Sequence, residues 1–498
     1  MENQNFFAAL LNAYQSKTDK PFLHLIDGRV ITYGEIDALS SQIAGALLQT
    51  GAMPGDRVVA QVEKSPENIA LYLGVLRAGL VYVPLNTAYT TEELAYFLDD
   101  AEPVIFVYAP EKHAELSPII RKANIANALT LGAESDGSLI EAAKTAAAFP
   151  AIEHRQTNDL AVILYTSGTT GRSKGAMLTH ENLSSNAKTL NSLWGFSAKD
   201  VLLHALPVFH IHGLFVALHT AMLSAAEVLF LPKFDIAELR RQLPRATVMM
   251  GVPTFYTRLL AEMNFGAADV DHMRLFTSGS APLTVEAFNE FKNRTGHTIL
   301  ERYGMSEAGM ITSNPLDGDH IAGTVGFALP DISVRIDAQN KTGPGEVEVK
   351  GPNIFDGYWK KPEKTREVFT SDGWFRTGDI GELDIEGRLS LVGRDKDLII
   401  AGGFNIYPIE IEQALNAAPG VLESAVIGAP HPDMGEGVVA VLVADGEKAD
   451  QENLTKAISS LAKFKRPRQF CWVDALPRNA MGKVQKQVLR EKFRSAFD

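Results

Sequence analysis

The segment Tyr165-Thr166-Ser167-Gly168-Thr169-Thr170-Gly171-Arg172-Ser173-Lys174-Gly175 combines glycines, hydroxyl groups and two cations. An apolar, strand-like run precedes it, and we expect it to lead into a helix that Thr179 caps. Glycine lets the backbone approach a ligand closely, and N–H, hydroxyl and ammonium groups bind phosphate oxygens. The order G-x-x-x-x-G-K-[ST] is absent, so this is not a Walker A loop. The pattern predicts a phosphate-binding loop of another kind; the alternative is an ordinary surface loop.

Four more motifs place ionisable residues along the chain: Glu301-Arg302-Tyr303-Gly304-Met305-Ser306-Glu307, Trp374-Phe375-Arg376-Thr377-Gly378-Asp379, Gly393-Arg394-Asp395-Lys396-Asp397 and Pro477-Arg478-Asn479-Ala480-Met481-Gly482-Lys483. Carboxylate oxygens are the ligands that Mg²⁺ prefers, and lysine or arginine side chains can neutralise charge on phosphates. Taken singly, each of these residues could be a solvated loop residue. Their joint occurrence requires one explanation.

With the glycine-rich loop, these motifs resemble those of the adenylate-forming superfamily, which includes acyl-CoA synthetases, luciferases and peptide-synthetase adenylation domains. The resemblance implies that ATP activates a carboxylic acid as an acyl-adenylate and that pyrophosphate leaves. The acyl group then passes to the thiol of coenzyme A, and AMP leaves. ATP and CoA are the implied co-substrates, and Mg²⁺ is the implied cofactor.

The resemblance assigns roles residue by residue. Lys483 would be the main adenylation catalyst and Lys396 the hinge, while Glu307 and Thr166 would hold Mg²⁺. Ser306 stands where the family more often has threonine, and Gly402, Gly403 and Phe404 would line the CoA passage. The predicted ATP-binding residues are Thr166, Ser167, Gly168, Thr169, Thr170, Gly171, Lys174, Ser280, Ala281, Glu301, Arg302, Tyr303, Ser306, Asp379 and Arg394.

The acid-binding residues are predicted to be His210, Arg258, Ser278 and Met305. His210, in Leu206-Pro207-Val208-Phe209-His210, resembles the family histidine that borders the acyl group. Arg258 follows a strand that would form a pocket wall, and a buried arginine needs an anion, so it predicts a second carboxylate on the substrate. The alternative is that Arg258 points to solvent or pairs with a carboxylate of the protein. The whole set of motifs is similar to that of malonyl-CoA synthetases. Malonate is the predicted acid, and 2-methylmalonate is a further candidate.

Three alternatives remain open. The acid could be a short-chain, medium-chain or aromatic carboxylate, or a carrier protein could replace CoA. A nucleotide-binding regulator without catalysis is the third. Lys174, Glu307, Asp379, Arg394 and Lys483 argue against it because a binder that had lost catalysis should have lost some of them.

The elements that would position these residues are predicted to be α/β. Between residues 20 and 330, strand-like runs alternate with helical stretches, which is typical of parallel sheets covered by helices. Short strands and tight turns follow at about 330–395. We expect an N-terminal domain of helix-covered β-sheets with this small β subdomain over residues 1–395. A smaller, mobile α+β domain over 396–498 would carry the catalytic lysine.

Composition and charge argue against nucleic acids and membranes as binding partners and favour small molecules. The net charge of −13 argues against broad nucleic-acid binding, although residues 461–498 are basic. The N-terminus does not resemble a secretory signal, and histidines interrupt the most apolar stretch, at 208–232, so we expect a buried segment and no membrane span. Cys471 is the only cysteine, in keeping with a reducing compartment. The expected location is cytoplasmic, with no obligatory protein partner.

Overall fold

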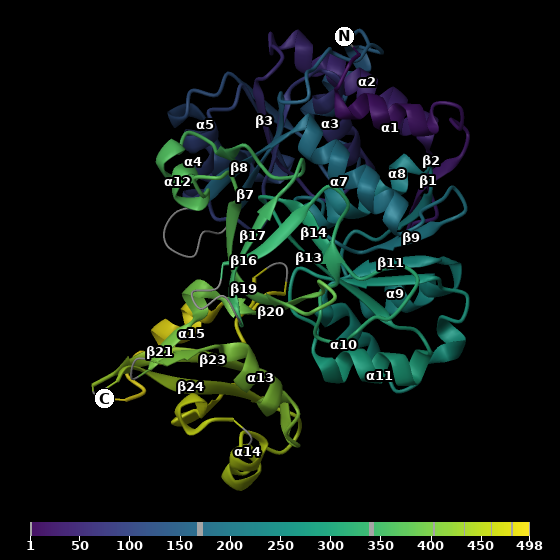
Figure 1. Ribbon diagram of the computed structural model, residues 1–498. Coiled ribbons are helices and arrows are strands. Elements are labelled where there is room, and N and C mark those ends of the chain that lie inside the picture. Colours follow the sequence, from purple (N-terminus) through teal and green to yellow (C-terminus); the bar gives the residue numbers. More distant parts are fainter. Residues whose placement is uncertain are drawn as a thin grey trace.

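The computed structural model describes residues 2–166, 173–337, 343–401, 404–432, 434–459, 461–479 and 482–497, without the side chains of Asp395 and Asn405. Figure 1 shows a large body of sheets and helices with the end of the chain as a smaller lobe below it. This is the α/β architecture with a separate C-terminal part that the sequence predicted.

One sheet of the body has seven strands among the described residues, and its central strands run parallel. The central strands are buried because helices cover the sheet. Its strands, in spatial order, are β18 (Gly357–Tyr358), β8 (Lys174–Thr179), β7 (Leu160–Thr166), β4 (Val81–Pro84), β3 (Arg57–Gln61), β5 (Ile105–Tyr108) and β6 (Asn127–Thr130). The helices close to its strands in sequence are α2 (Tyr33–Gln49), α3 (Pro66–Arg77), α4 (Thr91–Ala101), α5 (His113–Lys122), α6 (Ser138–Thr145) and the 3₁₀ turn Pro110–Lys112.

A second sheet, of nine described strands, contains six consecutive parallel strands from β13 to β1. Its strands, in spatial order, are β15 (Phe327–Ala328), β14 (Gly309–Ser313), β13 (Ile299–Met305), β12 (Leu275–Ser278), β11 (Val248–Gly251), β9 (Val201–His204), β10 (Glu227–Phe230), β1 (Pro21–Leu25) and β2 (Val30–Thr32). The helices close to its strands in sequence are α1 (Phe6–Tyr14), α7 (His180–Leu193), the π-helix His212–Leu218, α8 (His219–Leu223), α9 (Ile236–Gln242), α10 (Pro253–Ala261) and α11 (Val285–Thr295). Two 3₁₀ turns, Leu243–Arg245 and Ala267–Asp269, also belong to this part of the chain.

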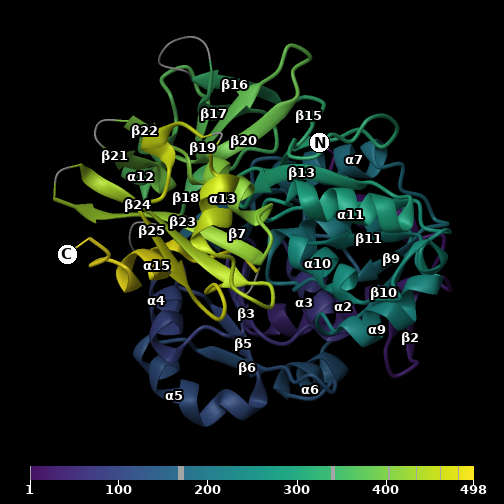
Figure 2. The ribbon, with the colours of Figure 1, turned by 90° about the horizontal axis from the view of Figure 1, so that it is seen from below.

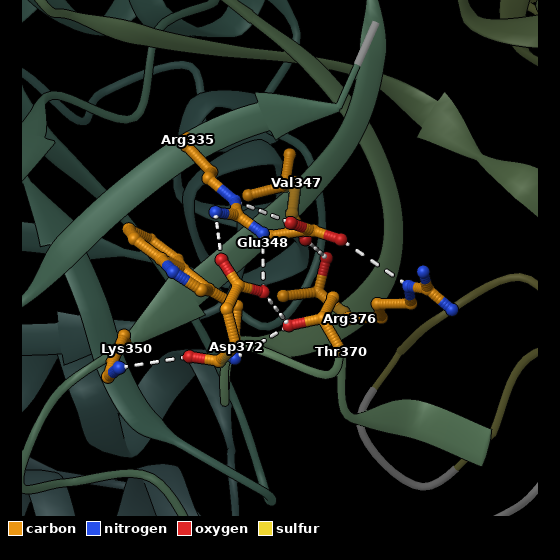
Figure 3. Close-up of polar contacts among 9 residues, drawn as sticks. Arg335, Val347, Glu348, Lys350, Thr370, Asp372 and Arg376 are labelled. Atoms are coloured by element: carbon orange, nitrogen blue, oxygen red, sulfur yellow. Dashed lines mark hydrogen bonds and ion pairs between the residues drawn. The ribbon is translucent and has the colours of Figure 1, made fainter. Parts of the chain in front are cut away.

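The small β subdomain is a four-stranded antiparallel sheet of β16 (Ser333–Asp337), β17 (Gly345–Lys350), β19 (Phe375–Leu383) and β20 (Leu389–Arg394), with α12 (Pro362–Val368) before β19. Glu348 of β17 lies opposite Arg335 on one neighbouring strand and Arg376 on the other. Its buried carboxylate pairs with both guanidinium groups, at 2.6 and 3.3 Å, as Figure 3 shows. Cross-strand charge pairs of this kind stabilise sheet register. They fix β19, which carries residues Phe375 to Asp379 of the Trp374–Asp379 motif.

The C-terminal lobe has hydrophobic clusters of its own, composed of residues from Ile399 onward. Its elements are β21 (Ile399–Ala401), β22 (Phe404–Ile406), α13 (Pro408–Asn416), β23 (Val421–His431), β24 (Gly435–Ala444), α14 (Gln451–Ala457), Lys463–Lys465, β25 (Gln469–Trp472) and α15 (Lys486–Lys492). The short helix Asp395–Asp397 joins it to β20. We propose the domain boundary there, at residues 395–396. Seen from below, in Figure 2, the lobe lies in front of the body.

The apolar stretch at 208–232 is buried, as predicted, within the largest hydrophobic cluster. No helix in the described part of the chain is both long and apolar enough to span a bilayer.

Candidate active site

The phosphate loop joins two antiparallel strands. Thr166, at the end of β7, lies opposite Lys174, at the start of β8. Residues 167–172, with the predicted ligands Ser167 to Gly171, lie outside the described residues. The helix that Thr179 was expected to cap is confirmed as α7, and strand β8 lies between the glycine-rich loop and this helix. Strand β8 therefore separates the N-terminus of α7 from the predicted phosphate loop.

A buried carboxylate lies beside the described end of this loop. Tyr358 donates a hydrogen bond from its hydroxyl to Oε1 of Glu307, at 3.0 Å, and its ring lies 4.4 Å from Nζ of Lys174. Burial raises the pKa of Glu307, whereas the hydroxyl of Tyr358 and the charges of Arg394 and Lys174 lower it. A buried carboxylate with nearby hydroxyl groups provides the hard oxygen donors that Mg²⁺ requires. The residues predicted as metal ligands, Glu307 and Thr166, therefore fit that ion chemically.

Strand β13 sends successive side chains to opposite sides, as the two-residue period of a strand requires. Tyr303 donates its hydroxyl to Oδ2 of Asp379 at 2.6 Å, and Nε of Arg394 lies 2.9 Å from Oδ1 of the same carboxylate. Asp379 and Arg394 are cross-strand neighbours on β19 and β20. The structure thus brings together three of the predicted ATP-binding residues. The carboxylate has lone pairs left for hydroxyl groups of a ribose.

Arg302, the residue before Tyr303, belongs to a different environment. Its side chain is only 4% exposed, and its charge is close enough to lower the pKa values of His210 and His212. Nε and Nη2 have no hydrogen-bond partner, and among the described residues no carboxylate forms an ion pair with it. A Cβ on Gly279 would come within 2.1 Å of Nη1, so the missing side chain makes room for the guanidinium group.

Burial lowers the pKa of Arg302 only to about 10, so the guanidinium is charged at neutral pH. A buried cation with unpaired donors is costly unless a ligand supplies an anion. The prediction grouped Arg302 with the ATP-binding residues; the structure places it among the histidines of the predicted acid site.

His210 lies at the same place and is neutral at physiological pH, because burial and then Arg302 lower its pKa to about 4. The backbone N–H of His212 donates to Nδ1 of His210 at 3.3 Å. This contact leaves the proton on Nε2, which can donate to a ligand. His212 in turn contacts the hydroxyl of Ser280 through Nδ1, at 3.3 Å.

The remaining predicted residues of the nucleotide and acid segments surround this area. Ser280 has positive φ, at 69°, and Ala281 next to it is partly buried. Ser278 is buried with an unpartnered hydroxyl, and Met305 and Ser306 are partly buried. Glu301 is buried and accepts a hydrogen bond from the backbone N–H of Gly323, at 3.3 Å. Burial raises its pKa to about 8, so the carboxyl is largely protonated at neutral pH.

Two lysines from the C-terminal part approach the ribose motif. Burial and then the charge of Arg394 lower the pKa of Lys483 to about 8, and Asp379 raises it. The pKa of Lys396 also falls to about 8, through desolvation of its ammonium group and then Arg394, although part of its side chain is exposed. The predicted catalyst and the predicted hinge residue therefore share one electrostatic environment with Asp379.

Arg258 is exposed, which corrects the premise that a buried arginine on α10 points to the acid. Its guanidinium stacks over Phe234, with 5.3 Å between its Cζ and the ring centroid. It lines a cavity of about 280 Å³ between the body and the loop that carries Lys483; the other lining residues are Leu206, Pro207, Phe234, Val252, Thr254, Phe255, Arg478, Asn479 and Gly482. The arginine buried beside His210 is Arg302.

Of the predicted CoA-binding residues, Gly402 and Gly403 lie outside the described part of the chain. Phe404 is exposed and stacks on Phe464, with ring centroids 4.6 Å apart. Sequence reasoning missed Tyr358, which contacts both Lys174 and Glu307. A tyrosine in the Gly357-Tyr358-Trp359 run has no periodicity that marks it as a site residue.

Residues 11–359 match the model of the AMP-binding enzyme family, and residues 410–483 match that of the AMP-binding enzyme C-terminal domain. The chain belongs to the AMP-binding enzyme family. The resemblance that the motifs indicated is therefore confirmed.

Relatives within the AMP-binding enzymes differ in the acid that their names state. Malonate–CoA ligase of Arabidopsis thaliana is 34% identical over 94% of this chain and 85% of its own length. A long-chain-fatty-acid–CoA ligase of Bacillus subtilis (strain 168) is also 34% identical, over 93% of this chain and 90% of its own. ATP-bound MatB from Rhodopseudomonas palustris is 50% identical over 100% of both chains, with a TM-score of 0.96. The TM-score to the apo form of the same MatB is 0.85, so this structure is more similar to the ATP-bound form.

Proposed function

We propose that this AMP-binding enzyme is an acid–thiol ligase that forms malonyl-CoA from malonate, ATP and CoA. The observation that carries the proposal is Arg302, a buried cation with two unpaired donor atoms beside His210. A fatty or aromatic acid would leave those donors unpaired, whereas a second carboxylate would satisfy them. The similarity to ligases that are named for malonate supports this choice.

In the first step, one carboxylate oxygen of malonate attacks the α-phosphorus of ATP, and the bond to pyrophosphate breaks. Lys483 would neutralise the charge that develops around the α-phosphate, which is the usual role of a fixed cation at such a site. His210 would donate from Nε2 to the reacting carboxylate. Asp379 and Arg394 would hold the ribose, and Arg302 the second carboxylate.

Glu307 and Thr166 would hold Mg²⁺, which when bound neutralises charge on the phosphates. Tyr358 would orient Glu307 through its hydroxyl, and Lys174 would add a cation beside the phosphate loop.

In the second step, the sulfur of CoA attacks the carbonyl carbon of the adenylate, and AMP leaves. Gly402, Gly403 and Phe404 would line the passage for the thiol after the C-terminal domain rotates at Lys396. The exposed ring pair of Phe404 and Phe464 would give that passage an apolar surface next to Lys463 and Lys465.

The size of the 2-substituent would depend on methionines near the end of β13. The methyl group of Met310 would lie 2.4 Å from a Cβ on Gly304, so it packs directly over that glycine. Met305 precedes the turn to β14. We propose that 2-methylmalonate is accepted and that larger substituents are excluded.

A pyrophosphate-release assay over a panel of acids tests the proposal. The panel contains malonate, methylmalonate, succinate, 3-methylbutanoate, octanoate and coumarate, each with and without CoA. We expect malonate to give the highest kcat/KM, continuous turnover to require CoA, and mass spectrometry to identify malonyl-CoA. Rapid turnover of octanoate or coumarate with none of malonate would refute the dicarboxylate assignment. Turnover that needs a carrier protein in place of CoA would refute the thiol acceptor.

A further inference from the structure

Lys64 connects the two sheets of the body at the ends of their parallel strands. It follows β3 of the seven-stranded sheet, and its ammonium group donates to carbonyl oxygens at the ends of two strands of the nine-stranded sheet. These acceptors are the carbonyl of His204, at 3.0 Å, after β9, and that of Leu231, after β10. The third contact is Nδ1 of His204, at 2.8 Å. The three contacts match the three N–H donors of an ammonium group.

No carboxylate accompanies this lysine. Among the described residues it forms no ion pair, and burial lowers its pKa well below the ordinary value. The group also lies 4.3 Å from the centroid of the Phe230 ring. Removing the ammonium group of a lysine from water costs free energy, and solvent does not supply the contacts that hold it here. Among the described residues, its three hydrogen bonds and the cation–π contact with Phe230 compensate for this cost.

His204 extends the contact to the start of the π-helix. Because Lys64 donates to Nδ1, the proton of the neutral imidazole is on Nε2, which donates to the carbonyl oxygen of Gly213 at 2.9 Å. His204 is 1% exposed and also stacks on Phe230. The side chain therefore ties the end of β9 to the residue that follows His212.

The segment between these two contacts, residues 205–212, carries His210. It folds back tightly, since a Cβ on Gly213 would come within 2.1 Å of the carbonyl oxygen of Pro207. Leu206 and Pro207 line the cavity next to Arg258, and His210 lies beside Arg302. Holding both ends of this short segment fixes the position of His210 relative to Arg302.

We propose that Lys64, acting through His204, is a positioning residue for the acid-binding segment that carries His210. The inference rests on the proposed function, because it assigns the segment to acid activation. A displacement of about 1 Å in such a segment can reduce catalysis roughly 100-fold. The effect should fall on the acid and leave the nucleotide contacts at Asp379 unchanged.

The test compares substitutions that break the connection with one that keeps it. Lys64→Met and His204→Leu remove it. His204→Gln keeps an oxygen that can accept from Lys64 and an amide that can donate to Gly213. We expect the first two variants to raise KM for malonate roughly tenfold or more, with KM for ATP within about twofold of wild type. His204→Gln should recover most of that loss.

Lys20→Met is the matched control, because Lys20 also donates to a backbone carbonyl, that of Ala198, and burial lowers its pKa too. It should lower the melting temperature without changing KM for malonate. The inference fails if folded Lys64→Met keeps the wild-type KM for malonate, if KM rises equally for malonate and ATP, or if His204→Gln and His204→Leu are equally impaired. If Lys64→Met does not fold, the two His204 variants decide. A wild-type enzyme that activates no acid would instead refute the proposed function.

Discussion

The exchange of Arg302 for methionine is the sharpest test of the dicarboxylate assignment. The substitution preserves approximate volume and removes the buried guanidinium whose Nε and Nη2 lack partners. With malonate bound, it leaves a buried carboxylate unpaired, which costs about 3–5 kcal/mol, or roughly 150- to 5,000-fold in kcat/KM. With 3-methylbutanoate, in which an isopropyl group replaces that carboxylate, the variant should be more active than wild type. The buried cation that this acid cannot satisfy would be gone.

The assay is pyrophosphate release at saturating ATP, with kcat/KM measured for both acids. Arg258→Met is the matched control, since Arg258 is an exposed arginine on the neighbouring cavity. This variant should change kcat/KM for the two acids by the same factor, less than about threefold, as expected for an exposed charge. Gly279→Ala gives an independent test, because its Cβ would come within 2.1 Å of Nη1 of Arg302. It should selectively impair malonate.

Equal loss of both acids in Arg302→Met would refute the role of Arg302. A selective loss of malonate in Arg258→Met would return the second carboxylate to Arg258.

Three further predictions concern Lys483 and the β subdomain. Lys483→Ala should reduce adenylate formation roughly 100-fold or more, while thioester formation from preformed acyl-adenylate stays within about threefold; equal loss in both half-reactions would contradict the assignment. The role proposed for Lys483 requires its protonated form, and its pKa is about 8, so kcat/KM should fall as pH rises through about 8. Lys483→Arg should abolish that decline, and Lys396→Met, which removes a like charge, should move it to higher pH. Glu348→Gln should lower stability by about 1.5–3 kcal/mol through its lost contacts with Arg335 and Arg376, seen as a lower unfolding temperature with unchanged acid preference at 25 °C.

Local patterns sufficed to predict the elements. The strand-like runs expected between residues 20 and 330 include β3, β7 and β10, and the tight turns expected at about 330–395 include Asp384–Gly387, where Gly387 has a φ of 86°. The segment Lys174–Thr179 forms strand β8 between the glycine-rich loop and α7, and no sequence pattern predicted this strand. Its pairing with β7 is a tertiary contact that the local sequence does not specify.

The candidate site was predictable where a motif carried its own chemistry, as at Asp379 and Arg394, which do pair. The site was not predictable where the role of a residue depends on the direction in which its side chain points. Arg258 and Arg302 are both arginines beside strands of one sheet, and only the fold shows that Arg302 is buried and Arg258 is not. Lys64 carried no signal in sequence, because its partners are 140 and 167 residues away.

The alternation of β13 also bears on how acid preference could change in evolution. Arg302 and Tyr303 are adjacent in sequence, yet Arg302 lies near His210 of the proposed acid site and Tyr303 contacts Asp379. If the proposed roles hold, a single codon change at position 302 would alter the range of acids and leave the proposed nucleotide contact at position 303 unchanged. An insertion or deletion in the strand would exchange the two side chains and disable both functions. This segment should diversify by substitution and resist changes in length.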